Sequence, residues 1–292
     1  MINTDALTLI NPQTGNLALK LFYLEGTSPF DQIQRLNYYT IIWIKKGLGT
    51  LKVDFSEYEF YENQILAFAP YQPFMLTLSE SLEATVLHFH PDFFCIHKHN
   101  AEVACNGVLF NNIYEPPIVT IDLHSENSIN IILEQIKFEI QHTRLAQYEL
   151  LISYLKTLLI TVSRLKKEQQ LSPELAEESG TPFILQTLKT YIETHYKTKH
   201  SASDYANLLN ISPKALTKIT KNHFNKTLTN LISERIVIEA KRELYLTNKA
   251  VKEIAYELGY DDEHYFSRFF KNNAEISPQL YRETVGFARA IH

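Results

Sequence analysis

Two short stretches in the last third of the chain carry side chains that suit contacts with a polyanion. In the first stretch, Lys214, Thr217, Lys218 and Lys221 recur at intervals of three or four residues or directly adjoin, so on a helix they share one face. Their ammonium and hydroxyl groups donate hydrogen bonds to phosphate oxygens and to the edges of bases. The pattern predicts a basic helical face directed at a charged partner.

The second stretch follows about fifty residues later and adds a stronger donor. Its outward-facing side chains are predicted to be Glu263, His264, Ser267, Arg268 and Lys271. A guanidinium can hold O6 and N7 of a guanine with two parallel hydrogen bonds, which makes Arg268 the best candidate for reading a base. A solvated surface arginine would give the same pattern, and the neighbouring acidic residues 261–263 would repel phosphate.

Each stretch lies in a pattern typical of a helix-turn-helix. In the first unit, Ser212 is predicted to cap the exposed helix, with Pro213 at its first position. In the second unit, Gly259 supplies the turn and Asp261 or Asp262 the cap. The apolar residues expected to face the core of the second unit are Val251, Ile254, Ala255, Leu258, Tyr265, Phe266, Phe269 and Phe270. One long helix, Leu231 to Leu246, is predicted between the units.

A metal site is a weaker hypothesis for the histidines of the first half. His88 and His90 are one residue apart, so on a strand both rings point to the same face, as a metal ion would require. His97 and His99 follow, with Cys95 nearby. No carboxylate follows the first pair at positions 93–95, and Pro91 ends the strand. We therefore expect ordinary histidines, with no metal and no cofactor.

The charge is unevenly distributed along the 292 residues. The net charge is −5, but residues 183–292 hold 16 Lys and Arg against 12 Asp and Glu, while residues 1–182 hold 12 against 21. A polyanion would therefore meet the C-terminal third. The two cysteines do not form a disulfide framework, and neither a signal peptide nor a membrane-spanning stretch is evident. These features predict a cytoplasmic protein.

The N-terminal part is predicted to be mainly β-structure followed by helices. Short apolar or alternating runs separated by Gly and Pro indicate a small antiparallel barrel or sandwich. Two amphipathic helices with wide apolar stripes follow, the first through Ile129 to Ile140 and the second through Leu151 to Leu165. The predicted divisions are 1–125 for the β domain, 126–167 for the helices, 168–182 for a linker and 183–292 for the helix-turn-helix domain.

Aromatic residues of the β domain form a candidate pocket for a small-molecule effector. The residues proposed to line the barrel interior are Tyr39, Trp43, Phe55, Phe68, Phe74 and Phe89. The alternative is that these rings simply fill the interior of the domain.

The C-terminal motifs closely resemble those of the AraC/XylS family of transcription regulators. The resemblance is carried by the motif Ile254-Ala255-xxx-Gly259-Tyr260-Asp261-xxx-Tyr265-Phe266-x-Arg268-x-Phe270-Lys271, then Ser277-Pro278-xx-Tyr281-Arg282. It implies a transcription activator that binds double-stranded DNA through the residues above and acts with RNA polymerase. Where the family usually has glycine, this chain has Asn225 and Glu275. A left-handed backbone suits Asn225, whereas Glu275 would be strained in it or must adopt another turn.

The N-terminal part resembles the family's cupin-type barrel more loosely. The matching residues are Thr40-Ile41-xx-Ile44-x-x-Gly47-x-Gly49 and Phe68-x-Pro70-x-Gln72-Pro73. The resemblance implies an α+β protein of two domains, a cupin-like antiparallel β-barrel with a helical segment that forms a homodimer, and an all-α DNA-binding domain. The apolar stripes of the helical segment could instead be buried within the domain. The rival function is a metal-dependent cupin enzyme with an accessory helical domain.

Overall fold

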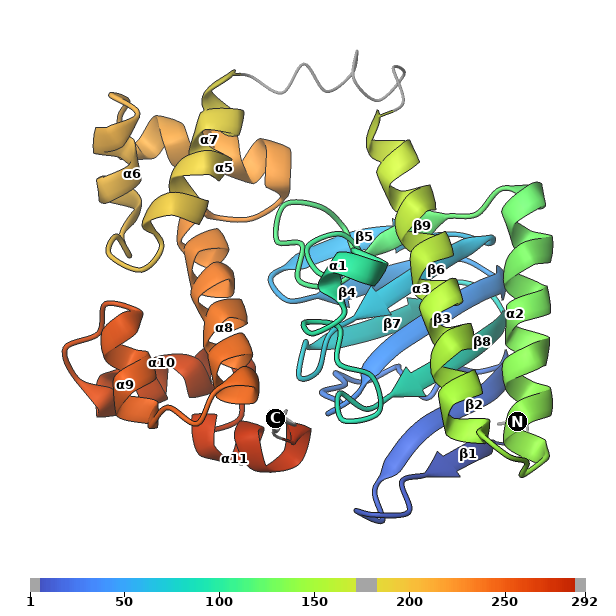
Figure 1. Ribbon diagram of the computed structural model, residues 1–292. Helices are drawn as coiled ribbons and strands as arrows, with labels where there is room; N and C mark the ends of the chain where they lie inside the picture. The colour runs from blue at the N-terminus through green and yellow to red at the C-terminus, as the bar shows by residue number, and fades with distance from the viewer. Residues whose placement is uncertain (1–5, 172–182, 287–292) are drawn as a thin grey trace. The chain divides into compact units, whose positions relative to one another are not determined.

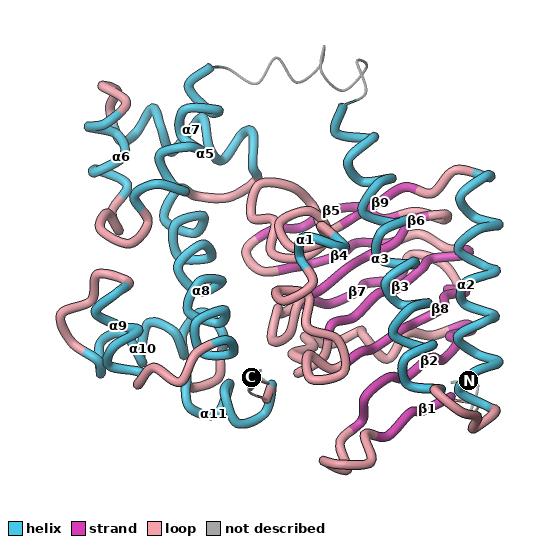
Figure 2. Tube along the Cα trace, in the orientation of Figure 1, coloured by secondary structure: helices cyan, strands magenta, loops and turns pink. Residues whose placement is uncertain are grey.

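The computed structural model describes residues 6–171 and 183–286, which form two compact units. Within these ranges, the N-terminal unit comprises residues 6–112 and 116–171, and the C-terminal unit comprises 113–115 and 183–286. Figure 2 shows that the strands all belong to the first unit, whereas the second is built from helices and loops. Of the predicted linker, residues 168–171 continue a helix, and residues 172–182 lie outside the described ranges.

The N-terminal unit contains two antiparallel sheets with a core between them, which is the sandwich and not the barrel of the two predicted alternatives. The larger sheet has the strand order β1-β2-β8-β3-β6-β9 and the smaller has β5-β4-β7. Their bounds are β1 Leu7–Ile10, β2 Leu17–Gly26, β3 Tyr39–Lys46, β4 Gly49–Val53, β5 Ser56–Phe60, β6 Gln64–Phe68, β7 Phe74–Leu78, β8 Leu82–Phe89 and β9 Ile118–Thr120. Pro70 and Pro73 separate β6 from β7; because proline has no N–H to donate to a ladder, the two strands end up in different sheets.

The central strand β3 is buried on both faces. Tyr39, Ile41 and Trp43 belong to the core that the large sheet shares with the helices, whereas Ile42 and Ile44 belong to the core between the two sheets. This division follows from the period-two alternation of a strand. It explains why β3 is a continuous run of β-branched and aromatic residues.

Two long helices cover one face of the large sheet (Figure 1). They are α2 (Leu123–Gln141) and α3 (Gln147–Leu171), and a short helix α1 (Asn100–Val103) precedes them. The apolar stripes that suggested a dimer interface are buried here: Ile129, Ile136, Leu155 and Val162 are all less than 1 % exposed. The interpretation that these stripes pack within the domain is therefore the one the structure confirms.

The C-terminal unit consists of seven helices within the described ranges. They are α5 (Phe183–His195), α6 (Ala202–Leu208), α7 (Pro213–Phe224), α8 (Leu228–Leu246), α9 (Val251–Glu257), α10 (Glu263–Ala274) and α11 (Pro278–Val285). The pairs α6–α7 and α9–α10 are the two predicted helix-turn-helix units, and α8 runs between them (Figure 1). The linking helix begins three residues earlier than predicted because Thr227, not a later residue, caps it through a 3.2 Å hydrogen bond from the Asn230 N–H.

A buried ion pair fixes α8 at its start, and a partly exposed one fixes its middle. The Lys226 ammonium donates to Glu234 Oε2 at 2.7 Å and also to the Ile113 carbonyl at 3.3 Å. Near the middle, the Arg235 guanidinium donates to Glu193 Oε2 of α5 at 2.8 Å and to Glu239 Oε2 at 3.2 Å. These partners satisfy charges whose burial would otherwise be costly, and they attach α8 to α5.

Candidate nucleic-acid interface

The first exposed helix, α7, begins as the sequence predicts. Ser212 has extended backbone dihedrals, and its hydroxyl accepts a 3.2 Å hydrogen bond from the Ala215 N–H, while Pro213 occupies the first turn. Leu216, Thr220 and Phe224 are buried and hold the helix against its unit. The opposite face is thereby set towards solvent, with its register determined by the cap and the buried side.

The four predicted contact residues of α7 lie together on that outer face. Lys214, Lys218 and Lys221 are exposed and Thr217 is half-buried. All four line a shallow surface hollow together with Ser212, Pro213 and Ala215. Because α7 contains no Asp or Glu, the three lysines around this hollow give the outer face of α7 a positive charge.

The second exposed helix, α10, starts from a carboxylate cap. The Asp262 side chain accepts a hydrogen bond from the Tyr265 N–H, which identifies Asp262 as the cap and leaves Asp261 ahead of the helix. A carboxylate at this position also interacts favourably with the positive end of the helix dipole. Asp262 thus stabilises the start of α10, although its carboxylate would repel a polyanion.

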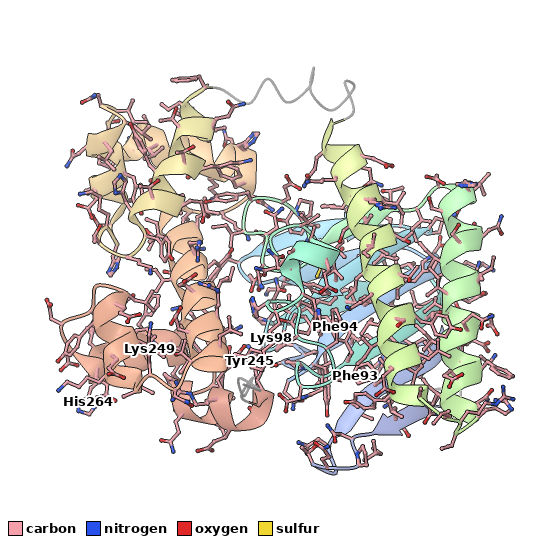
Figure 3. All side chains as sticks on the ribbon, viewed as in Figure 1. Phe93, Phe94, Lys98, Tyr245, Lys249 and His264 are labelled. Atoms are coloured by element: carbon pink, nitrogen blue, oxygen red, sulfur yellow. The ribbon has the colours of Figure 1, made fainter. Side chains whose placement is uncertain are left out.

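The predicted contact residues of α10 are not equally exposed. His264, Arg268 and Lys271 are exposed and lie on one helical face, whereas Glu263 and Ser267 are half-buried. His264 extends from the beginning of α10 on the side away from α8 (Figure 3). These three exposed side chains give α10 an outer face with hydrogen-bond donors, as the lysines do for α7.

The prediction that Tyr265 faces the core was wrong. Its side chain is 59 % exposed, while Phe266 and Phe270 are fully buried. Tyr265 precedes Arg268 by three residues and so lies beside it on the helix surface. The helical spacing itself was the available signal, since a residue three before an exposed arginine shares its side of the helix; the aromatic type of Tyr265 obscured it.

Arg268 differs from the other described arginines of the C-terminal unit. Arg235 and Arg242 are paired with Glu239 at 3.2 and 2.8 Å. Arg282 donates to the backbone carbonyls of Leu244 and Lys249 at 3.0 and 2.7 Å. Arg268 has no hydrogen-bond or ion-pair partner within the ranges the structure describes. Its guanidinium keeps all its donors for an external acceptor.

The six aromatics proposed as an effector pocket do not surround a common space. Tyr39, Trp43 and Phe89 lie in the core beneath α2 and α3, on one face of the large sheet. Phe68 and Phe74 are between the sheets, stacked on each other with ring centroids 4.0 Å apart. Phe55 is 50 % exposed in the turn between β4 and β5. Successive side chains of a strand point to opposite faces of the sheet. The large sheet therefore separates the first three rings from the stacked pair.

The histidine pair of β8 is buried and bonded within the protein. The His88 ring is hydrogen-bonded to the Thr40 hydroxyl at 2.9 Å, and Tyr38 contacts both His88 and His90. Burial, aided by the charge of Lys20, lowers the pKa of His88 to about 3. Within residues 6–171 and 183–286, no group of three or more His, Cys, Asp or Glu side chains is placed to hold a metal ion. In the same ranges, no helix is long and apolar enough to cross a membrane.

Comparison with known proteins assigns the C-terminal unit. Residues 205–284 match a family model described as a helix-turn-helix domain. The chain is 34 % identical over 94 residues to the HTH-type transcriptional activator Btr of Bacillus subtilis, covering 32 % of this chain and 18 % of Btr. It is 32 % identical over 97 residues to the raffinose operon transcriptional regulatory protein RafR of Pediococcus pentosaceus, covering 33 % of this chain and 35 % of RafR. The chain thus spans well under half the length of these two relatives.

The solved structure of ToxT from Vibrio cholerae covers more of the chain with a weaker likeness. The identity is 16 %, with 91 % of this chain and 98 % of ToxT aligned, and the TM-score is 0.39. Such a score supports no conclusion about the N-terminal unit. The sequence match over residues 205–284, together with the paired helix-turn-helix geometry, shows that the C-terminal unit contains a helix-turn-helix domain similar to those of HTH-type transcription regulators.

Proposed function

We propose that the chain is a sequence-specific DNA-binding transcription regulator in which α7 and α10 enter two successive major grooves of one duplex. A recognition helix reads base edges with its first turns while the preceding helix crosses the backbone. Successive major grooves on one side of the duplex are about 34 Å apart. The observation that carries the proposal is the exposure of donors on both helices, above all the guanidinium of Arg268, which is unpaired among the described residues.

The two helices contribute different kinds of contact. The α7 surface offers three lysines and no acid, which favours phosphate contacts that hold the protein in register. The α10 surface offers Arg268, whose planar guanidinium matches guanine, with His264 and Tyr265 beside it. Sequence discrimination is therefore assigned mainly to α10.

The salt dependence of binding tests the electrostatic part of this function. The logarithm of the association constant falls linearly with the logarithm of the salt concentration. Each phosphate that a lysine or arginine neutralises makes this slope steeper by about 0.9. Exchanging Lys214, Lys218 and Lys221 for glutamine should reduce that slope by two to three phosphate equivalents, or ~2–3. The slope would be measured by fluorescence anisotropy with labelled duplex DNA. An unchanged slope in the triple variant would exclude these lysines as phosphate contacts.

The N-terminal unit is proposed to regulate the DNA-binding unit in response to a small-molecule effector or another protein. This unit brings no group of metal-ligating side chains and no common aromatic pocket among its described residues, so no ligand class is assigned. We also propose that the chain acts with RNA polymerase in the cytoplasm, because the relatives it matches are transcription regulators of bacteria.

A homodimer is proposed through the outer face of α2. Leu123, Ile131 and Phe138 are 79, 63 and 44 % exposed, and their spacing of eight and seven residues puts them on one side of the helix. Leu145, just beyond α2, is 99 % exposed. A second copy that presents the same stripe would bury these apolar side chains in a two-fold contact.

A further inference from the structure

The turn that precedes α6 and the turn that precedes α10 meet within the C-terminal unit. The turn after α5 contains Lys197, and the turn after α9 contains Gly259. A Cβ atom placed on Gly259 would lie 2.0 Å from the Lys197 carbonyl oxygen and 3.1 Å from its carbonyl carbon. Gly259 also has a φ of +81°, in the left-handed region. Glycine is needed here both for the turn and for direct contact between two backbones.

Aromatic contacts connect these two turns to α10. The His200 ring lies against the Tyr260 ring with centroids 4.8 Å apart, and Tyr260 in turn contacts Phe266 and Phe269 of α10 at 5.3 and 5.2 Å. His200 Nε2 is buried and makes no hydrogen bond to any part of the chain that the structure describes. The imidazole therefore acts here through the packing of its ring on Tyr260.

The same turn is attached to the first helix-turn-helix unit. The hydroxyl of Tyr205, a fully buried residue of α6, donates a 3.1 Å hydrogen bond to the Lys199 carbonyl. The Tyr196 ring lies 4.0 Å from the Arg235 guanidinium on α8. A continuous set of contacts thus leads from α6, through the turn after α5, to Gly259, Tyr260 and α10.

We propose that Lys197, His200, Gly259 and Tyr260, which we call the junction, fix the separation and rotation of α7 relative to α10 and so determine the spacing between DNA segments that the chain accepts. The α8 helix connects the two helix-turn-helix units along its own axis. The junction is a second connection between them, and it opposes rotation of one unit about the axis of α8. A change of one base pair moves one DNA segment about 3.4 Å along the duplex and about 35° around it. When the separation and rotation of α7 and α10 are fixed, the two helices fit only one spacing between the DNA segments.

The inference rests on the proposed two-segment DNA binding, and a spacing series tests it. The full chain would be titrated with duplexes in which the two recognised segments are separated by the preferred number of base pairs, or by one or two more or fewer. The wild-type chain should lose about tenfold in affinity for each base pair, comparable to a mismatched pair. His200→Ala should flatten this dependence to less than about threefold. His200→Phe, which keeps the ring contact, should restore the wild-type profile.

Gly259→Ala is the complementary variant. It should shift the preferred spacing or flatten the profile, because its Cβ pushes against the Lys197 carbonyl. Both His200 variants should bind a duplex that retains only the α10 segment with the wild-type affinity. Identical spacing profiles for the wild type and His200→Ala would overturn the proposal.

A measurement on the free protein separates this inference from the function on which it rests. Spin labels introduced at Asn222 and Asn272, which are exposed on α7 and α10, report the distance between the two helices. The wild type and His200→Phe should give one narrow distance distribution, and His200→Ala a broadened one. Broadening without any sequence-specific DNA binding would refute the proposed function while supporting the junction. An unbroadened distribution would refute the junction whatever the DNA result.

Discussion

Arg268 is the residue on which sequence discrimination depends in this account. Its guanidinium is exposed and unpaired among the described residues, whereas those of Arg235, Arg242 and Arg282 are held by the protein. Arg268→Ala should lose about 1–3 kcal/mol of preference at one base step of the segment read by α10. Competition binding with duplexes substituted one base at a time would measure the loss.

Lys221→Ala is the matched control for that substitution. An exposed lysine that contacts phosphate contributes equally to all sequences, so its removal should weaken binding uniformly. If Arg268→Ala instead retained the full preference at every position, base reading by this residue would be excluded.

The burial of His88 should make the stability of the N-terminal unit depend on pH. In the folded chain the pKa of His88 is lowered to about 3 by burial and by Lys20, whereas the unfolded chain has an ordinary pKa near 6.5. Below pH 6.5 the unfolded state therefore binds a proton that the folded state does not, so the free energy of unfolding falls as the pH drops towards 3. At pH 4.5 the loss should be about 2–3 kcal/mol.

His88→Gln should remove that part of the pH dependence. Urea denaturation at pH 7 and 4.5 would measure it, with His124→Gln as the control because His124 is exposed on α2. The control should keep the wild-type difference between the two pH values. A wild-type difference that persisted in His88→Gln would show that other groups are responsible.

Helix ends are the elements that the sequence predicted best. Ser212 and Pro213, Gly259, and the cap at Asp262 depend on short-range geometry, so residues a few positions apart suffice to identify them. The same holds for the left-handed positions: Asn225 and Glu275 have φ values of 54° and 55°, as the glycines of the related family would. Glu275 adopts the strained conformation rather than another turn.

Glu275→Gly should therefore stabilise the C-terminal unit. A left-handed conformation costs an L-residue roughly 1–2 kcal/mol, and glycine avoids this cost at the expense of greater freedom in the unfolded chain. A net gain of about 1 kcal/mol is expected, seen as a higher Tm by calorimetry. Asn225→Gly should gain less, since Asn tolerates this conformation better. Equal or lower stability of Glu275→Gly would show that interactions of the Glu275 side chain outweigh the strain.

The surfaces of elements were harder to predict than their ends. Ile136 and Leu155 have the pattern of an interface stripe, but the sheet buries them; which partner covers an apolar helix face depends on tertiary packing that periodicity does not encode. The aromatic pocket failed for the same reason, because Trp43 and Phe68 leave their strands on opposite sides of one sheet.

The outer face of α2 gives the prediction for assembly. Ile131→Glu combined with Phe138→Glu should convert a dimer to a monomer, because two charges would be buried in an apolar contact. Light scattering coupled to gel filtration would measure the mass. Leu280→Glu is the control, since Leu280 is 46 % exposed on α11, outside the proposed contact. A double variant that still forms a dimer would place the interface elsewhere.

At the scale of the whole molecule, the two units divide the work. The C-terminal unit, with the greater share of basic residues, carries both exposed recognition helices, and the N-terminal unit carries the acidic excess. The sequence located the helix-turn-helix unit because its caps, turns and core positions are local and repeat along the chain. It did not determine the two-sheet architecture, since the pairing of strands depends on contacts between distant residues.

Selection of bound DNA from a random library tests the central claim most directly. The full chain would be mixed with random duplexes, and the retained molecules amplified and sequenced over several rounds. If α7 and α10 enter successive major grooves, the enriched motif will have two short segments whose centres are about 10 base pairs apart, with a guanine in the segment that loses its preference in Arg268→Ala. Retained DNA with no enriched motif, or with a single segment unaffected by Arg268→Ala, would contradict it.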